Sequence, residues 1–558
     1  MTGNGEKSGL VLGGYPAKRC ARAVHNDFSP FSPPKPSVDA ATQQLFDAGN
    51  AFETLVNDRL GAVPGAALLS DEDGWDANIG RTLAAMRSGA PLIVNGRLPR
   101  VGARVGAPDV LVRVGQGYVP VDVKLHGTRR NTIRGSLWVS SLDDPAGRRQ
   151  VGGLSDAGGY VEGDGLQLAH YTRMLQALDL HPGTGHLIGG IIGQSDFTDL
   201  GGDPWLVVWY DLATPRRVTY SASAASGRAK RSLLERYDHE FAFRLTVAET
   251  ARAGGELVRP FHVTECASCL WEEYCTQVAG PEDASFAIQA GLPTAQQWRL
   301  LYDTGVRTIV DLAAAAEECP PGWSPRDTQP GPTAEKKYRT LVRRARMAQS
   351  GVEFEPLHHW PRIPTADVEI DFDIEWDLEH RIYLWGLRIR DGQDEATAVF
   401  DPVVSYDPLD DDGASQLASV FAARLRRLIG EAEAAGRSVK VFHWSHPERS
   451  MTAKYPEVDA LLQGRTFDLH AWFRDHFLTR AGTSLKVVAP IFGFHWEVDD
   501  AGGAESQLKI TLARAGGEEA HVARDWLNRY NESDVAAQAA IRDGLRTATA
   551  ASASPTAR

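Results

Sequence analysis

Acidic residues alternate with apolar ones along the stretch Asp367-Val-Glu-Ile-Asp-Phe-Asp-Ile-Glu-Trp376. In a β-strand, successive side chains point to opposite faces of the sheet, so the apolar residues would enter a core and the acids would share the other face. The acids that crowd this face are Asp371, Asp373 and Glu375. Like charges this close repel unless a cation lies among them, and divalent metal ions prefer carboxylate oxygens as ligands. The stretch therefore predicts a metal site; the alternative is a solvated edge strand with an acidic face.

Three downstream segments offer partners to this strand, and one of them is the segment 483–493. A predicted strand over Val439–His443 runs into the segment Trp-Ser-His-Pro-Glu448, which would place a carboxylate at the start of a helix. A helix over 520–545 would carry Tyr530 and Asp534 on one face, because residues four apart lie one turn from each other. Together with the acidic strand, these segments predict a cluster of carboxylates beside a tyrosine.

This arrangement resembles the DEDD 3′–5′ exonucleases of the ribonuclease H-like superfamily, over about residues 365–545. Asp373 and Glu375 match the family's D-x-E motif, and Tyr530 and Asp534 match its Y-x-x-x-D motif. The resemblance implies that four acids hold two divalent metal ions and that the tyrosine orients the attacking water. In such a site, one metal ion activates the water and the other stabilises the leaving 3′ oxygen.

The second acid of that family is usually an aspartate, and this chain departs from the pattern. We assign the position to Glu448; Asp468 is the competitor, although its surroundings favour the end of a core strand. The departure leaves open whether the site is fully active. Asp371 matches no motif position, so it is expected either to tune the site or to face solvent.

A second group of charged residues lies in the N-terminal half of the chain. The segment Gly106–Arg113 predicts a turn and a strand that carries Asp109, and Tyr118–Lys124 predicts the returning strand. Asp122 and Lys124 lie two residues apart, so both would face the same way. The two carboxylates could hold Mg²⁺ or Mn²⁺, while the lysine positions water or stabilises a pentavalent phosphate. An Asp-x-Lys pair alone is common and carries little weight.

The N-terminal block resembles the RecB-like branch of the PD-(D/E)xK nucleases over about residues 10–280. The matched segments are Phe52-Glu53, Pro108-Asp109, Asp122-Val-Lys124 and the Q-x-x-x-Y helix, Gln167-Leu-Ala-His-Tyr171. In that family the helix glutamate and the strand acids hold metal, the lysine is catalytic, and the Gln/Tyr pair organises the site and the DNA strand. The resemblance implies these roles for Glu53, Asp109, Asp122, Lys124, Gln167 and Tyr171. The Gln/Tyr pair alone also fits an ordinary amphipathic helix, and His25 is a further candidate that we expect to be structural.

Four of the five cysteines form a pattern, C-x2-C-x5-C near the end of this block and a single cysteine near its start. In a reducing cytoplasm such a pattern favours metal or cluster binding over disulfides. It resembles the iron–sulfur clasp of AddB-type and CRISPR-adaptation nucleases, in which a [4Fe-4S] cluster ties together the two ends of the nuclease domain. The resemblance implies the ligands Cys20, Cys266, Cys269 and Cys275. Zinc would also suit four thiolates, and free thiols are the third option; Cys319 is expected to be a small buried hydrophobe.

At 558 residues the chain is expected to form two to four domains. We predict an α/β multidomain protein with a restriction-endonuclease-like core, a small helical module, and a ribonuclease H-like α/β domain with a mixed sheet. The predicted bounds are 10–280, 283–350 and 365–545. We further predict a disordered leader over 1–10, a loop over 128–158 and a disordered tail over 546–558.

The helical module contains a helix, a turn at Gly305 and a second helix, similar to a helix–hairpin–helix, which offers backbone amides to phosphate groups. A basic run from Lys336 to Arg346 could assist. The alternative is a packing linker with a solvated basic face.

The overall composition limits the partners of the protein. A net charge of −13 argues against binding nucleic acid over the whole chain, although acids that hold metal inflate the negative count. No apolar run approaches the ~20 residues of a membrane span, and the N-terminus lacks a secretory signal, so we expect a cytoplasmic protein without a membrane partner. The chain has no Walker A motif, so any helicase motor would be a separate protein.

The order of the three parts resembles a bacterial family of two-nuclease fusion proteins. We therefore predict a metal-dependent DNA nuclease, an exonuclease on single-stranded ends, in DNA repair or in defence against foreign DNA. An RNA-processing nuclease and a non-catalytic DNA-end-binding scaffold with a degenerate site are the alternatives.

Overall fold

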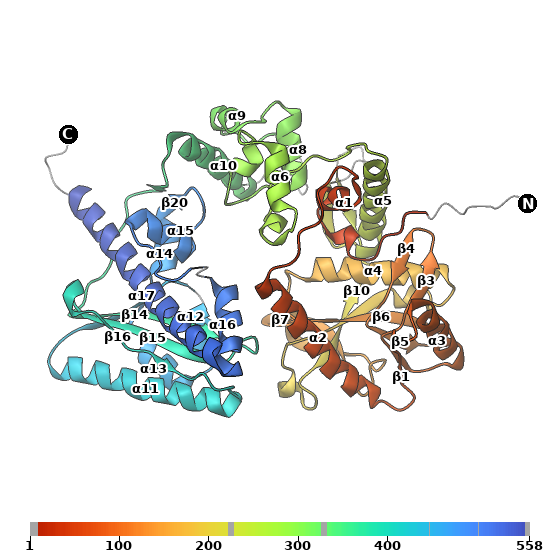
Figure 1. Ribbon diagram of the computed structural model, residues 1–558, viewed down its shortest axis with the longest axis horizontal. Helices are drawn as coiled ribbons and strands as arrows, with labels where there is room; N and C mark the ends of the chain where they lie inside the picture. Colours follow the sequence, from red (N-terminus) through yellow and green to blue (C-terminus); the bar gives the residue numbers. More distant parts are fainter. Residues whose placement is uncertain (1–8, 221–227, 325–331, 446, 500–501, 553–558) are drawn as a thin grey trace, which may run out of the picture.

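The chain forms two α/β parts that are joined by a small helical part (Figure 1). The computed structural model describes residues 9–220, 228–324, 332–445, 447–499 and 502–552. The two α/β parts also touch directly, because helix α2 (Ala40–Gly61) lies against helix α16 (Gly503–Ala515). In this contact Gln44 Nε2 donates to the carbonyl oxygen of Gln507 at 3.2 Å.

The N-terminal part is built on an eight-stranded mixed sheet in the order β1-β2-β5-β6-β9-β10-β7-β8. Strands β5 and β6 form an antiparallel hairpin around Gly115, and β6 runs parallel to β9. In the order of the sheet, the strands are β1 (Ala67–Leu68), β2 (Leu92–Val94), β5 (Val110–Val114), β6 (Gly117–Lys124), β9 (Ile188–Gly193), β10 (Leu206–Asp211), β7 (Arg129–Ser141) and β8 (Arg149–Asp156).

Helices cover both faces of this sheet. Phe52 and Val56 of α2 pack on one face, whereas Leu168 and Ala169 of α4 (Val161–Ala177) belong to the core on the other face. The remaining helices are α1 (Ala21–Phe28), α3 (Trp75–Ser88), α5 (Leu233–Arg252) and α6 (Glu272–Ala279), with the short helices η1 (Pro16–Lys18), η2 (Thr184–His186), η3 (Thr198–Leu200) and η4 (Thr264–Ser268). Two small ribbons complete the part: β3 (Leu98–Val101) with β4 (Arg104–Gly106), and β11 (Arg217–Tyr220) with β12 (Arg228–Arg231).

Two sequence-based predictions fail in this part. The segment 128–158 is not a loop but the long hairpin β7–β8, because Leu137 and Val139 alternate inward and Trp138 pairs with Trp209 on β10. The expected leader is shorter than ten residues: Leu10 is buried in the core, and residues 1–8 lie outside the described ones.

The connecting part contains the helices α7 (Ala284–Ala287), α8 (Ala295–Asp303), α9 (Ile309–Ala314) and α10 (Pro332–Ser350). They pack around Trp298 and Leu341, and Cys319 is a partly buried member of this core. In the turn between α8 and α9, the backbone N–H of each residue from 304 to 309 donates to an intramolecular acceptor. The turn therefore presents none of these amides to a phosphate group.

Three arginines of the basic run on α10 are also engaged within the protein. Arg343 pairs with Glu355 and Arg346 pairs with Glu317, while Arg344 donates to the carbonyl oxygen of Thr479. These contacts give the arginines a packing role between the connecting part and its neighbours.

The C-terminal part has a mixed six-stranded sheet, in which β16-β15-β14-β18-β19 are neighbours and β17 also pairs with β15. The central strand β14 runs antiparallel to β15 and parallel to β18. The strands are β14 (Val368–Trp376), β15 (Ile382–Asp391), β16 (Val399–Phe400), β17 (Val403–Val404), β18 (Val439–His443) and β19 (Thr466–Asp468); β13 (Phe354–Pro356) and β20 (Phe477–Thr479) form a separate ribbon.

Helix α11 (Asp411–Ala434) packs under one face of this sheet, and α17 (Glu518–Ser552) crosses the other face over β14 (Figure 1). The predicted tail over 546–558 begins too early, because α17 continues to Ser552, after which the chain lies outside the described residues. The other elements are η5 (Glu395–Thr397), α12 (Pro447–Thr452), α13 (Pro456–Leu462), α14 (Leu469–His476), α15 (Leu485–Val488) and η6 (Ala489–Phe492). Among the described residues, no helix combines the length and the apolar character that crossing a membrane requires.

Candidate nuclease sites

Three acids from two distant segments meet between β14 and α17. One carboxylate oxygen each of Asp373, Glu375 and Asp534 lies within 4.8 Å of the others, and all three residues are buried. Within the part of the chain that the structure describes, no other set of three or more His, Cys, Asp or Glu side chains brings its ligand atoms this close together. Buried carboxylates at this spacing fit the oxygen ligands that Mg²⁺ and Mn²⁺ take.

A fourth acid, Glu448, lies beside them at the start of α12. Burial raises the pKa of Asp373 well above its usual range, and neighbouring acids raise it further; they are Asp534, Glu375 and Glu448. Burial, followed by Asp534, raises the pKa of Glu375 to about 8. Four carboxyl groups so arranged cannot all ionise without added positive charge. The competing acid, Asp468, instead caps α14 by accepting from the backbone N–H of Ala471 at 2.7 Å.

Polar side chains that the sequence did not single out orient the cluster. Ser506 Oγ donates to Glu375 at 2.7 Å, and Asn531 Nδ2 donates to Asp373 at 2.7 Å. Asn531 follows Tyr530 directly, whereas Ser506 reaches the site because α16 folds back over the sheet.

A cation and two aromatic rings surround Asp534. Lys486 Nζ and Trp496 Nε1 both donate to its Oδ1, the latter at 2.6 Å. The ammonium of Lys486 lies 3.9 Å from the ring centroid of Trp496 and 4.3 Å from that of Tyr530. The cage therefore engages Oδ1 of Asp534 and brings one positive charge to the acids. The sequence signal for this cage is Lys486 itself, the lone charged residue in the otherwise uncharged segment 484–496.

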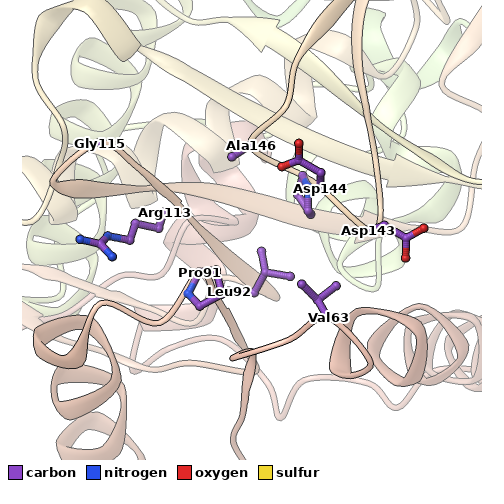
Figure 2. Close-up of a pocket in the computed structure, with 9 residues that line it drawn as sticks. Val63, Pro91, Leu92, Arg113, Gly115, Asp143, Asp144 and Ala146 are labelled. Atoms are coloured by element: carbon purple, nitrogen blue, oxygen red, sulfur yellow. The ribbon is translucent and has the colours of Figure 1, made fainter.

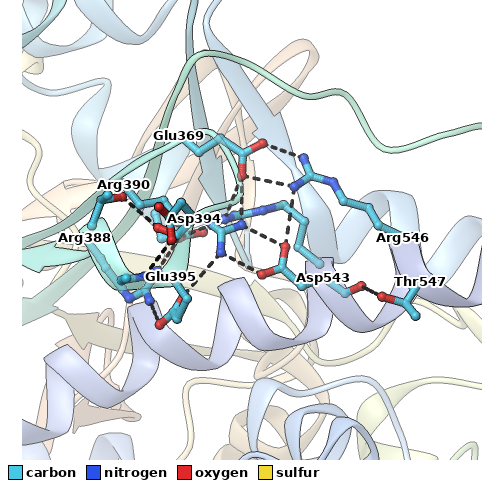
Figure 3. Close-up of polar contacts among 12 residues, drawn as sticks. Glu369, Arg388, Arg390, Asp394, Glu395, Asp543, Arg546 and Thr547 are labelled. Atoms are coloured by element: carbon cyan, nitrogen blue, oxygen red, sulfur yellow. Dashed lines mark hydrogen bonds and ion pairs between the residues drawn. The ribbon is translucent and has the colours of Figure 1, made fainter.

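The other half of the acidic face of β14 is neutralised by arginines (Figure 3). Glu369 pairs with Arg390 at 2.9 Å. Arg542, on α17, binds Asp371, and Arg388 Nη1 lies 3.7 Å from Asp371 Oδ2. Asp371 is fully buried, so the alternative in which it faces solvent is wrong. Although burial alone would raise the pKa of Glu369, the arginines lower it below the usual value.

In the N-terminal part, the hairpin β5–β6 and α2 bring together the predicted acids. Lys124 Nζ lies 3.1 Å from Asp122 Oδ2, and Asp109 accepts from the backbone N–H of Val123 at 2.7 Å. Burial raises the pKa of Asp109 well above its usual range; Asp122 raises it further, and Glu53 has a smaller effect in the same direction. Although burial opposes it, Asp122 raises the pKa of Lys124, which is therefore a cation.

The fit of this second site to a metal ion rests on Asp122. It is fully buried, and among the described residues its Oδ1 has no hydrogen-bond partner. A buried carboxylate oxygen without a partner is costly unless a cation or a proton donor meets it.

The helix α4 carries the Gln/Tyr pair toward this site. Gln167 Nε2 donates to the hydroxyl of Tyr171 at 3.2 Å, and burial, followed by Asp122, raises the pKa of Tyr171. His25 instead lies in α1, where burial and the adjacent Arg22 lower its pKa. The structure thus brings Gln167 and Tyr171 near the acids and associates His25 with Arg22.

The four patterned cysteines line one small pocket between the two ends of the N-terminal part. It is bounded by Cys20 beside α1 and by Cys266, Cys269 and Cys275 on and around η4 and α6. Burial raises the pKa of Cys266 to about 12, and the nearby thiols add to this effect. Among the described residues, no three of these sulfur atoms lie within 4.8 Å of one another.

A separate cavity of about 300 Å³ lies between β2, β5 and the turn after β7 (Figure 2). Arg113 also lines it, and its guanidinium is directed away from the other lining residues and donates to the carbonyl oxygen of Gly89 at 2.9 Å (Figure 2). Asp143 at the opposite side pairs with Arg59. None of the predicted site residues lines this cavity.

Comparison with known proteins supports the C-terminal site. Residues 370–546 match the model of the RNase_H superfamily, a range that begins in β14 and ends in α17 and so contains the four-acid cluster. No curated protein and no solved structure matches the chain. Members of the matched superfamily are generally nucleases, so the match supports a hydrolase that acts on nucleic acid.

Proposed function

We propose that this protein is a metal-dependent DNA nuclease with two active sites, and that it degrades DNA from single-stranded ends. The observation that carries the proposal is the cluster of Asp373, Glu375 and Asp534 within a region that matches a nuclease superfamily. The proposed role in DNA repair or in defence against foreign DNA, with a helicase as a separate partner, follows from the resemblance of the domain order to two-nuclease fusion proteins.

At the C-terminal site, Asp373, Glu375, Glu448 and Asp534 would hold Mg²⁺ or Mn²⁺. The bound ions would lower the pKa of water and stabilise the charge on the leaving oxygen. Asn531 and Ser506 fix the orientation of the strand acids, and the Tyr530 hydroxyl, which contacts Asp534, would orient the attacking water.

At the N-terminal site, Glu53, Asp109 and Asp122 would hold the same kind of ion. Lys124 is a cation beside Asp122, so it can bind the phosphoryl oxygen on which charge develops. Gln167 and Tyr171 form a hydrogen-bonded pair that would position the strand against these groups.

We further propose that the four cysteines bind a [4Fe-4S] cluster with a structural role. In a tetrahedral zinc site with Zn–S bonds of about 2.3 Å, the sulfur atoms would lie about 3.8 Å apart. We propose the cluster rather than zinc because the cysteine pattern resembles the iron–sulfur clasp and all four thiols line one pocket. The cluster would tie α1 to α6, the two ends of the N-terminal part.

A cleavage series tests the proposal. Wild type, Lys124→Ala, Asp373→Ala and the double mutant would be incubated with Mn²⁺ and end-labelled single-stranded DNA or RNA. We expect each single mutant to lose part of the DNA cleavage and the double mutant to lose at least 100-fold, about the contribution of such groups. Persisting cleavage in the double mutant would contradict both site assignments. Preference for RNA would favour an RNA-processing nuclease, and inactivity of the wild type would favour an end-binding scaffold.

A further inference from the structure

Lys18 is a basic residue at the N-terminal site that no motif identifies. It ends η1, which lies against α4, and its Nζ donates to Gln167 Oε1 at 2.8 Å. Gly14 allows this close approach, because a Cβ at that position would lie 3.3 Å from Gln167 Cγ and 3.4 Å from His170 Cβ. The ammonium of Lys18 therefore lies directly on the Gln167–Tyr171 pair.

Lys18 also lies within the electrostatic field of the two catalytic strands. Burial lowers its pKa, and the ammonium of Lys124 lowers it further, whereas the carboxylates of Asp164 and Asp122 act in the opposite direction. Lys18 and Lys124 thus place two ammonium groups around the acids predicted to hold metal. Two ammonium groups beside one metal site can bind two successive phosphate groups of a strand that crosses it.

Within the part of the chain that the structure describes, Lys18 is not paired with a carboxylate, whereas four other lysines are. Lys35, Lys124, Lys486 and Lys509 each lie within 4 Å of a carboxylate oxygen. Among the described residues, no carboxylate oxygen lies that close to Lys18 Nζ, which has the amide oxygen of Gln167 and the ring of Tyr15 as its neighbours. A lysine ammonium has three N–H donors, so donors remain for an anionic ligand.

The cysteine pocket fixes the backbone of this lysine. Two residues after Lys18, the backbone N–H of Cys20 donates to Glu265 beside Cys266 at 2.9 Å. Between them, the guanidinium of Arg244 on α5 donates to the carbonyl oxygen of Arg19 at 2.8 Å. These bonds hold the end of η1 against α5 and η4, on the side of the cysteines.

We propose that Lys18 binds a phosphate group of the nucleic-acid strand at the N-terminal site, next to the one that is cleaved. This inference rests on the proposed nuclease function of that site. Lys18 would be a positioning residue that binds the sugar-phosphate backbone of the strand. The cysteine pocket would set the distance between Lys18 and Lys124. Binding through phosphate is independent of base sequence.

The test uses the full chain carrying Asp373→Ala, so that cleavage reports on the N-terminal site. Binding of a fluorescent single-stranded oligonucleotide is measured in Ca²⁺ over a range of salt concentrations, for this parent and for its Lys18→Met, Lys18→Arg and Lys35→Met derivatives. We expect Lys18→Met to weaken binding about 10-fold, as for a hydrogen bond to a charged group. The slope of log affinity against log salt should become shallower by about 0.7, one phosphate contact on a single strand.

Lys18→Arg should retain most of the affinity, and Lys35→Met, which removes an ammonium paired with Asp27, should match the parent. An unchanged salt slope in Lys18→Met would overturn the proposal, even if cleavage falls. A failure of the nuclease proposal would be seen separately. In that case Lys124→Ala in the same background would leave cleavage unchanged, and the salt slope of Lys18→Met would still show whether Lys18 contacts phosphate.

Discussion

Asp371 and Asp373 leave the same face of β14 two residues apart, yet only Asp371 meets an arginine. Asp371 Oδ2 accepts from Arg542 Nη2 at 3.1 Å, whereas Asp373 lies among Glu375, Glu448 and Asp534. Arg542, the partner of Asp371, and Asp534, a neighbour of Asp373, both lie on α17, where Arg542 is two turns beyond Asp534. The acidic face of β14 is therefore divided into a half that the protein neutralises itself and a half that it leaves for another cation.

This division predicts opposite effects of two similar substitutions on stability. Asp371→Asn removes one partner of a buried ion pair and should lower the free energy of unfolding by about 3–5 kcal/mol. Asp373→Asn should change it by less than about 1 kcal/mol in metal-free protein, because Asp373 has no arginine partner to lose and its burial among acids disfavours the charged form. Urea denaturation in EDTA measures both values. A loss in Asp373→Asn as large as that in Asp371→Asn would contradict the division.

The raised pKa of Glu375 predicts a pH dependence of the metal-free protein. In the unfolded chain this group ionises near its ordinary value of about 4.3, whereas in the folded protein it ionises near 8. Between these values the folded state binds more protons, so the free energy of unfolding should fall as pH rises from about 4.5 to 8, by up to about 1.4 kcal/mol per unit.

Glu375→Gln isolates this contribution from that of other titrating groups. The difference in the free energy of unfolding between wild type and Glu375→Gln should change across the window in EDTA. This change with pH should become smaller when Mn²⁺ is added, because a bound cation favours the ionised carboxylate. A difference that stays constant from pH 5 to 8 would show that Glu375 titrates at its ordinary pKa.

The cysteine pocket predicts a spectroscopic signature. Protein purified without oxygen should be brown, with absorbance near ~400 nm from a [4Fe-4S] cluster. Cys266→Ser should lose this absorbance and lower the melting temperature, because the two ends of the N-terminal part are no longer joined. Cys319→Ser is the matched control, since that cysteine packs within the connecting part and should leave the absorbance unchanged. A colourless wild type loaded with zinc would refute the cluster.

The period-2 pattern of the acidic strand was sufficient to predict β14 and the face on which its acids lie. It was not sufficient to predict how their charges are compensated, because the partner of Asp371 is 171 residues away in sequence. Asp371 and Asp373 have equivalent sequence surroundings, and only the packing of α17 distinguishes them. The same limit applies to Lys486 and Lys18, which reach their sites through tertiary contacts.

The hairpin β7–β8 was missed for a different reason. Glycine, serine and arginine dominate its exposed positions, and this composition is typical of a loop. Its strand character comes from pairing with β10, where Val139 and Val208 are opposite each other and both are fully buried. A short apolar alternation within a polar segment could have revealed the strand.

Mn²⁺ binding to the four-acid cluster tests the central claim most directly. Isothermal titration would use protein carrying Asp122→Asn, which weakens the N-terminal site, and compare it with versions that also carry Asp373→Asn or Asp367→Asn. Asp367 lies on the same face just before β14 but is exposed, and its carboxylate accepts from Ser438 at 2.7 Å. We predict that Asp373→Asn weakens Mn²⁺ binding at least 10-fold and that Asp367→Asn leaves it unchanged. Equal Mn²⁺ binding by all three proteins would contradict the assignment of this cluster as a metal site.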